Sequence, residues 1–143
     1  MRTLFAAPTP RRARTRAPRR PRSSASSPAS PTETEALVSA GVDRLDSIYA
    51  GCMSGGRVVA QEHLGPLFAD WIGMAGVPAT RVESACASGG VALRSAFIEV
   101  ASGMSDLVMA AGVEKMTDAT DVTDVLATAA DQEYEAYNGV TFP

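Results

Sequence analysis

ATRVESACASGGVALRSAFIEVASGMSDLVMAAGV, residues 79–113, contains the pattern that decides the fold. Residues 79–84 are typical of a short strand, and residues 91–102 of a helix that is apolar nearly all round and ends at Gly103. Residues 107–113 are a continuous apolar run, as expected of a strand covered on both faces. A strand, a helix and a strand in this order predict two parallel strands joined by a crossover helix. Because its polar stripe is narrow, we expect the helix to be largely buried.

The same alternation extends along the chain in both directions. The other expected elements are a helix over 32–41, a strand over 45–51, a glycine-rich loop over 51–56, a helix containing Leu64 to Ile72, and an amphipathic helix from about 120 to 138. Pro66 requires the second of these helices to begin or to kink near it. The pattern predicts an α/β fold with a mostly parallel sheet and crossover helices.

The first 32 residues differ in composition from the rest. Residues 1–22 contain eight of the 13 basic residues, and all 16 acidic residues follow this segment. So little apolar surface cannot offset the entropy of ordering, and we expect residues 1–32 to be disordered. Three interpretations stay open: an organelle transit peptide, a solvated basic arm, or a spurious start, which we favour slightly. The acidic remainder argues against nucleic acid as a partner.

Two cysteines are too few for a disulfide framework, and nothing resembles a secretory signal or a membrane span. We therefore expect a soluble, cytoplasmic protein. Cys86 lies where a strand gives way to a helix, and the unpaired N–H groups of a helix start favour a thiolate there. Gly89 and Gly90 leave the backbone open to a bulky substrate. A single cysteine is nevertheless more often a small buried hydrophobe.

Three separated blocks add a family resemblance. VESACASGGVALRSAFIEVASGMSDLVMAAGVEKMT (82–117), YAGCMSGGRVVAQEHLGPL (49–67) and AADQEYEAYNGVTFP (129–143) resemble thiolases, most closely the archaeal, sterol-carrier-type acetyl-CoA C-acetyltransferases. The resemblance covers about residues 35–143. It implies a thiolase-like fold of which this chain supplies an incomplete first half. Residues 33–118 would be the N-terminal half-domain without its first strand, and residues 119–143 the truncated start of the loop domain.

The resemblance also implies a chemistry. Cys86 is expected to carry an acetyl group, and its N–H to help hold the oxyanion. Met116 would line the acyl pocket, although a packing role is about as common. The family's histidine base, asparagine loop and second cysteine belong to a second half, and His63 and Cys52 lie in the wrong blocks to replace them. We therefore expect little turnover from this chain alone.

By resemblance, the reaction condenses two acetyl-CoA molecules to acetoacetyl-CoA, or reverses this step, in lipid metabolism. No metal or redox cofactor is expected. The implied partners are acyl-CoA, further copies in a homodimer or homotetramer, and an assembly with hydroxymethylglutaryl-CoA synthase; neither nucleic acid nor membrane is expected. Two alternatives remain: a β-ketoacyl synthase-like condensing enzyme and a non-catalytic CoA- or lipid-binding subunit.

Overall fold

A computed structural model describes residues 31–139 of the chain. The elements run in the order α1 (Pro31–Ala40), β1 (Ser47–Gly51), α2 (Gly55–Val58), α3 (Leu64–Trp71), β2 (Ala79–Val82), η1 (Ala85–Ala87), α4 (Ser88–Ala101), β3 (Val108–Gly112), η2 (Met116–Asp118), α5 (Val122–Ala127) and η3 (Gln132–Ala136). The expected disorder of the arginine-rich segment falls on residues 1–30 and lies outside the described residues. None of the described helices is long and apolar enough to cross a membrane.

The three described strands form one parallel sheet in the order β2-β1-β3. Ile48 pairs with Ala79 on one side and with Met109 on the other. Both connections from strand to strand pass through helices, as the sequence pattern predicts. The predicted α/β class, the parallel sheet and all three strands are therefore confirmed.

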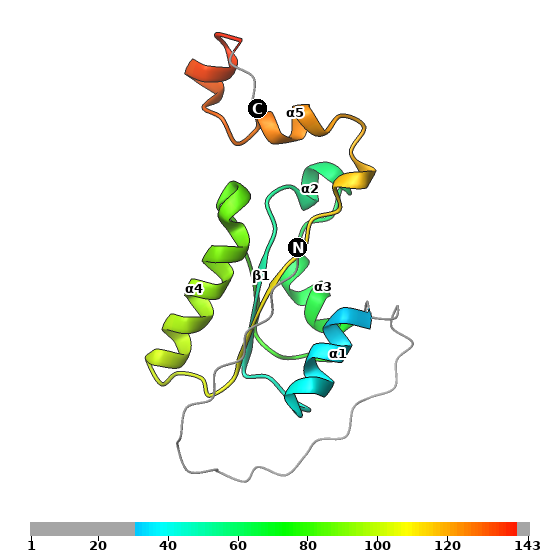
Figure 1. The fold of residues 1–143 in the computed structure, drawn as a ribbon, viewed down its shortest axis with the longest axis vertical. Coiled ribbons are helices and arrows are strands. Elements are labelled where there is room, and N and C mark those ends of the chain that lie inside the picture. The colour runs from blue at the N-terminus through cyan, green and yellow to red at the C-terminus, as the bar shows by residue number, and fades with distance from the viewer. Residues whose placement is uncertain (1–30, 140–143) are drawn as a thin grey trace.

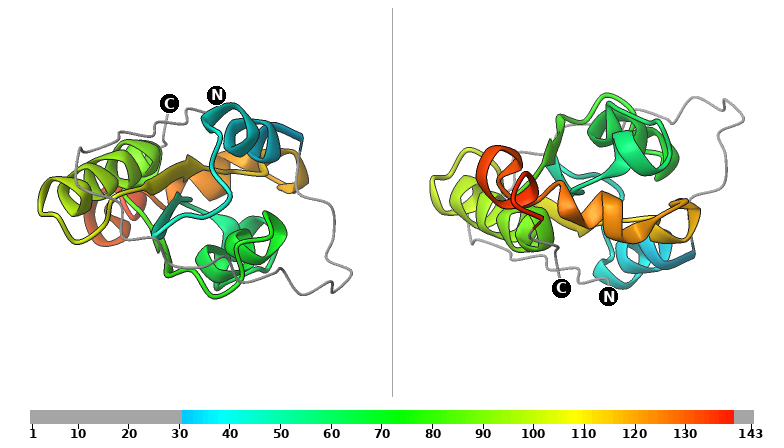
Figure 2. Two further views of the ribbon diagram at one scale, coloured as in Figure 1. Left: turned by 90° about the horizontal axis from the view of Figure 1, so that it is seen from below. Right: turned by 90° about the horizontal axis from the view of Figure 1, so that it is seen from above.

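Helices cover both faces of this sheet. Figure 2 shows α4 separated from α1 and α3 by the strands. On the α1 and α3 face, Ile48 and Met109 pack against Leu37 and Phe68. On the α4 face, small residues of the helix pack against alternate strand residues; this second cluster consists of Ala92, Ala96, Val108 and Ala110. Successive strand residues supply opposite layers because their side chains alternate.

Two glycines allow the helices to approach the strands closely. A β-carbon at Gly65 of α3 would lie 2.7 Å from the carbonyl oxygen of Ala79 in β2. A β-carbon at Gly51, the last residue of β1, would lie 2.6 Å from the carbonyl oxygen of Ser88 at the start of α4. Both distances are shorter than any normal contact, so only glycine fits in these two places.

The predicted helix over 91–102 exists but differs in two respects. It begins earlier, at Ser88, directly after the short η1 turn. It is also not largely buried, because 70% of Phe97 is exposed and Leu93 and Ile98 are more than two-fifths exposed. Small residues face the sheet and the larger apolar side chains point outward, so the described part of the chain covers only one side of the helix.

The predicted single helix from about 120 to 138 is wrong. This segment instead contains two separate pieces, the helix α5 and the short π-helical turn η3. Both pieces lie beyond the carboxyl ends of the strands (Figure 1). Each piece has its own N-cap. Asp121 accepts hydrogen bonds from the backbone N–H groups of Thr123 and Asp124, and Asp131 accepts from those of Glu133 and Tyr134. A cap of this kind begins a new helical segment rather than continuing an old one.

Candidate active site

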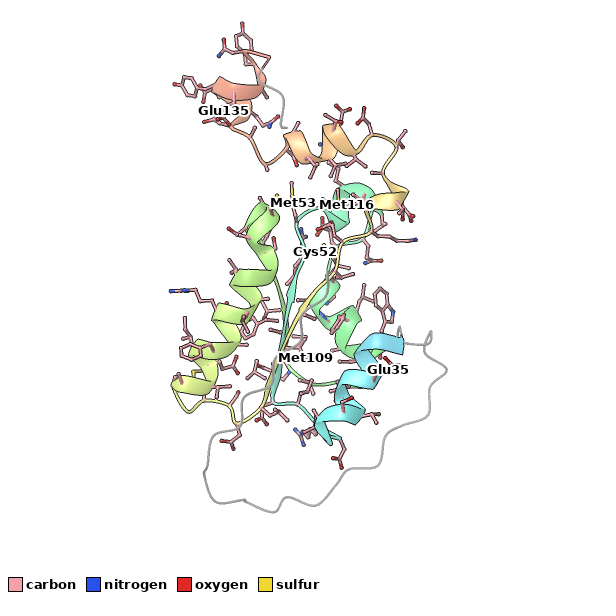
Figure 3. All side chains as sticks on the ribbon, in the orientation of Figure 1. Glu35, Cys52, Met53, Met109, Met116 and Glu135 are labelled. Carbon is pink, nitrogen blue, oxygen red and sulfur yellow. The ribbon has the colours of Figure 1, made fainter. Side chains whose placement is uncertain are left out.

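The chemically interesting residues gather where the parallel strands end. The loops after β1 and β3 and the turn after β2 all leave from the carboxyl edge of the sheet. Figure 3 shows Cys52, Met53 and Met116 in this region, at the carboxyl ends of the strands. Loops at this edge are the usual place for a ligand in an α/β fold.

Cys86 lies in the η1 turn, immediately before the 14-residue helix α4, and its side chain is exposed. Among residues 31–139, no backbone or side-chain acceptor is found for the Cys86 N–H. A thiol at this place meets the positive end of the helix dipole and the unpaired N–H groups of the first turn. The arrangement suits a nucleophile whose attack generates a negatively charged oxygen.

The residue before Cys86 adopts an unusual backbone conformation. Ala85 has a φ of 45°, in the left-handed region. For a residue with a β-carbon this conformation costs about 1–2 kcal/mol. Ala85 begins the η1 turn between the end of β2 at Val82 and the start of α4 at Ser88, directly before Cys86. Strain of this size persists only where the surroundings hold it in place.

Gly51 fixes the start of α4 against the sheet. The missing β-carbon would clash with three backbone atoms, at 2.6 Å from the Ser88 oxygen, 2.7 Å from the Ser88 carbonyl carbon and 2.8 Å from the Gly89 nitrogen. Strand β1 and the first turn of α4 are thus in direct backbone contact. This contact sets the position of Cys86 relative to the carboxyl edge.

Two side chains hold the loop that follows β1. The carboxylate of Glu114 accepts hydrogen bonds from the Met53 N–H at 2.8 Å, the Ser54 N–H at 3.1 Å and the Ser54 hydroxyl at 2.6 Å. From the other side, Arg81 donates to the carbonyl oxygens of Cys52 at 3.0 Å and Met53 at 2.7 Å. An anion on the N–H groups and a cation on the carbonyl groups fix the backbone of this loop.

Cys52 is held inside this loop and differs sharply from Cys86. Only 3% of Cys52 is exposed, and its Sγ lies 3.7 Å from Oε1 of Glu114. Burial raises the pKa of the Cys52 thiol, and the negative charge of Glu114 raises it further. Cys52 is therefore a neutral, packed thiol near neutral pH, whereas Cys86 is accessible.

Comparison with known proteins places this geometry in a family. The family model described as "Thiolase, N-terminal domain" matches residues 29–142. The chain belongs to the thiolase family. It is 57% identical over 110 residues to an acetyl-CoA acetyltransferase of Methanothermobacter thermautotrophicus, which covers 76% of this chain and 29% of the relative.

Two further relatives support the same assignment. An acetyl-CoA acetyltransferase of Methanocaldococcus jannaschii is 51% identical over 111 residues, covering 76% of this chain and 28% of the relative. The benzoylsuccinyl-CoA thiolase subunit BbsB of Thauera aromatica is 38% identical over 87 residues, or 58% of this chain and 21% of that protein. The chain thus spans less than a third of the length of the curated thiolases it matches. The family predicted from the three sequence blocks is confirmed.

The other predicted site residues of this thiolase chain fall at the same edge of the sheet. A β-carbon at Gly89 or Gly90 would meet nothing within 4 Å, so the space over the first turn of α4 is open. Met116 begins η2 and is 38% exposed, two residues after Glu114. His63 precedes α3 with an exposed side chain in the QEHLG segment. The roles of Cys86, Gly89, Gly90 and Met116 stay predictions.

Sequence reasoning missed the residues that hold the site. Ser88 and Glu83 bond the turn around Ala85, and Arg81 holds the loop after β1. The signal for Arg81 is a lone cation in a short strand next to the predicted site. Ser88 is a small polar residue in the first turn of an otherwise apolar helix, where serine typically bonds the backbone.

Proposed function

We propose that this chain carries the acyl-accepting part of a thiolase-type acetyl-CoA acetyltransferase, with Cys86 as the nucleophile. The observation that carries the proposal is the exposed Cys86 thiol at the start of α4, with its own N–H unpaired among the described residues. The names of the two archaeal relatives support acetyl-CoA as the substrate.

In the proposed step, the Cys86 sulfur attacks the carbonyl carbon of acetyl-CoA. A bond forms between the Cys86 sulfur and this carbon, the bond from the carbon to the CoA sulfur breaks, and the thiol proton ends on CoA. The carbonyl oxygen becomes negative in the transition state, and the Cys86 N–H is placed to donate to it. The product is an acetyl-cysteine, and a second acetyl-CoA would accept this group to give acetoacetyl-CoA. The step uses a thiol, a thioester and backbone donors, so we propose no metal or redox cofactor for it.

The surroundings of Cys86 support this role. The open space over Gly89 and Gly90 gives an extended thioester access to the backbone. The fixed loop at Met53 and the exposed Met116 present flexible apolar side chains near the edge where the acetyl methyl group would lie. Methionine adapts its shape to small apolar groups, which suits an acyl pocket.

The decisive experiment is acetylation of the chain by acetyl-CoA, with mass spectrometry to locate the modified residue. We expect one acetyl group per chain on Cys86, none on Cys86→Ser, and undiminished labelling of Cys52→Ser. A Cys86→Ser variant that is labelled as fast as the unchanged chain would remove Cys86 from the mechanism.

Turnover is tested in a chimera, because the chain spans less than a third of the length of its relatives. Residues 33–143 would replace the matching part of the Methanothermobacter enzyme, to which the chain is 57% identical over 110 residues. The chimera is expected to form acetoacetyl-CoA, and the same chimera with Cys86→Ser to form none. Normal turnover by the chimera with Cys86→Ser would refute the assignment of Cys86 as the nucleophile.

The two alternative functions make different predictions in these assays. A β-ketoacyl synthase-like enzyme would transfer acyl groups in the chimera but elongate with malonyl rather than acetyl thioesters; the thiolase family model favours the thiolase. A non-catalytic CoA-binding subunit would bind acetyl-CoA without acetylating Cys86. The proposed homo-oligomer and the assembly with hydroxymethylglutaryl-CoA synthase are tested by light scattering of the chimera with and without the synthase.

A further inference from the structure

The turn that carries Cys86 is held by two side chains that take no part in the proposed chemistry. Both peptide groups of the left-handed Ala85 are bonded. Its N–H donates to the carboxylate of Glu83, and its carbonyl oxygen accepts from the Ser88 hydroxyl at 2.7 Å and from the Ser88 backbone N–H. The Ser88 hydroxyl also accepts from the Ser84 N–H at 2.9 Å. A strained conformation persists only where its surroundings hold it, and these bonds hold Ala85 on both sides.

Ser88 is buried, and its side chain bonds residues on the other side of Cys86 in the sequence. Only 5% of it is exposed, and its hydroxyl uses its donor and one acceptor site on the two residues that precede Cys86. Ser88 itself follows Cys86 by two residues. Its hydroxyl therefore closes a small ring of hydrogen bonds around the Cys86 turn.

The backbone of Ser88 connects this ring to the sheet. The Ser88 carbonyl group lies so close to Gly51 that a β-carbon there would come within 2.6 Å of it. One side of Ser88 is thus fixed on β1, and its hydroxyl fixes the residues before Cys86. Displacement of the turn relative to the sheet requires that one of these contacts break.

We propose that Ser88 is a positioning residue for Cys86 in acyl transfer, an inference that rests on the proposed function. Ser88 has no direct contact with the substrate in this role. It keeps Ala85 in the left-handed conformation, and this conformation aims the Cys86 N–H and the Cys86 thiol at one thioester carbonyl. Without the hydroxyl, Ala85 relaxes toward negative φ and the peptide between Ala85 and Cys86 rotates, so the oxyanion loses its donor.

The test compares two reagents on the same thiol of the whole 143-residue chain. Acetylation by acetyl-CoA needs the thiol and the N–H aligned together, whereas alkylation by iodoacetamide needs only an accessible thiol. The measured quantity is the ratio of the two rate constants at Cys86, obtained by mass spectrometry. Buried Cys52 serves as an internal folding control, since it reacts with iodoacetamide only when the chain opens.

Ser88→Ala is expected to lower this ratio about 10- to 30-fold, the effect of two hydrogen bonds, while Cys52 stays protected. Ser88→Thr keeps a hydroxyl and is expected to restore most of the ratio. A purely structural role for Ser88 would change the protection of Cys52 and leave the ratio unchanged. An unchanged ratio in a folded Ser88→Ala protein overturns the inference.

A second variant decides the matter if Ser88→Ala fails to fold. Glycine adopts positive φ without strain, so Ala85→Gly combined with Ser88→Ala is expected to restore the protection of Cys52. The ratio is expected to stay low, because the turn is then unstrained but no longer fixed. A ratio equal to that of the unchanged chain would show that the hydroxyl only offsets strain, and would overturn the inference.

The outcomes for the unchanged chain separate this inference from the proposed function. If Cys86 reacts with iodoacetamide but is acetylated by acetyl-CoA neither in this chain nor in the chimera, the proposed function fails and the role of Ser88 fails with it. If the unchanged chain is acetylated and Ser88→Ala is acetylated equally fast, only the role of Ser88 fails.

Discussion

Substitution of Gly51 by alanine tests the contact between β1 and α4 on which the site depends. The new β-carbon would lie 2.6, 2.7 and 2.8 Å from three backbone atoms of Ser88 and Gly89. Because these atoms belong to the backbone, no side chain can rotate away, and the start of α4 must move by several tenths of an ångström. Overpacking of this kind costs about 1–3 kcal/mol, and contact with backbone places Gly51→Ala at about 2–3 kcal/mol. For a domain of this size, the expected decrease in Tm is about 10–20 °C.

The assay is thermal and urea unfolding followed by circular dichroism, together with acetylation of Cys86. Gly90→Ala is the matched control, because the same added methyl group would meet nothing within 4 Å in the first turn of α4. The control is expected to keep its stability or to gain up to about 1 kcal/mol from better helix propensity. Equal stability of Gly51→Ala and the unchanged chain would refute the close contact.

Three further predictions concern the thiols and the charged groups. Iodoacetamide near neutral pH is expected to alkylate Cys86 at least about 100-fold faster than Cys52, because burial raises the pKa of Cys52 and blocks access to its thiol. In urea the two rates should converge. Equal rates in the folded chain would contradict the buried position of Cys52. Glu114→Gln keeps the shape of the side chain but weakens its hydrogen bonds to two backbone N–H groups and a hydroxyl. Urea unfolding should therefore show that the unfolding free energy falls by about 1–2 kcal/mol. An unchanged unfolding free energy would show that the loop is held by Arg81 alone. Burial acts to raise the pKa of Glu99, but hydrogen bonds, first from Ser105, hold it below its usual value of 4.5. The ionised Glu99 therefore stabilises the folded chain above about pH 4.5, and this contribution is lost as the pH falls through the lower folded pKa. Glu99→Gln should flatten that part of the pH dependence of the unfolding free energy, and an unchanged profile would contradict this.

The fold was predictable because its signals are local. The strands within 107–113 and 79–84 could be predicted from the composition and length of these segments alone. Gly41 follows the end of the first helix as predicted, with a φ of 64°. The burial of α4 was not predictable in the same way. An apolar pattern shows that a helix has surface to bury, but the described residues cover only the face with Ala92 and Ala96.

The helix expected at 120–138 shows where periodicity misleads. The apolar spacing in the sequence crosses the break between α5 and η3 without a signal, whereas the caps at Asp121 and Asp131 that divide the two pieces depend on two hydrogen bonds each. An aspartate in the middle of a periodic segment looks the same in a sequence whether it caps a helix or lies on a polar face.

The candidate site was predictable as a position but not as a structure. A cysteine before an apolar helix, with two glycines after it, identifies the edge of the sheet from sequence alone. The contacts that hold this edge join residues far apart in the chain: Glu114 bonds Ser54, 60 residues away, and Arg81 bonds Cys52, 29 residues away. Only the register of the parallel strands brings these partners together.

The alternation of a strand explains why two cysteines at one edge have opposite properties. Gly51 faces α4, and the next residue, Cys52, therefore points to the other side of the sheet, toward Gly55 of α2. Cys52 is buried there beside the Glu114 carboxylate, which disfavours its thiolate. Cys86 lies outside the sheet, in the η1 turn between the end of β2 at Val82 and the start of α4. A shift of one residue in the register of β1 would exchange the faces of Gly51 and Cys52, and it would close the space that α4 needs against the sheet. The register of β1 therefore places Gly51 against α4 and Cys52 in the buried layer on the opposite face, so that of the two thiols only Cys86 is exposed.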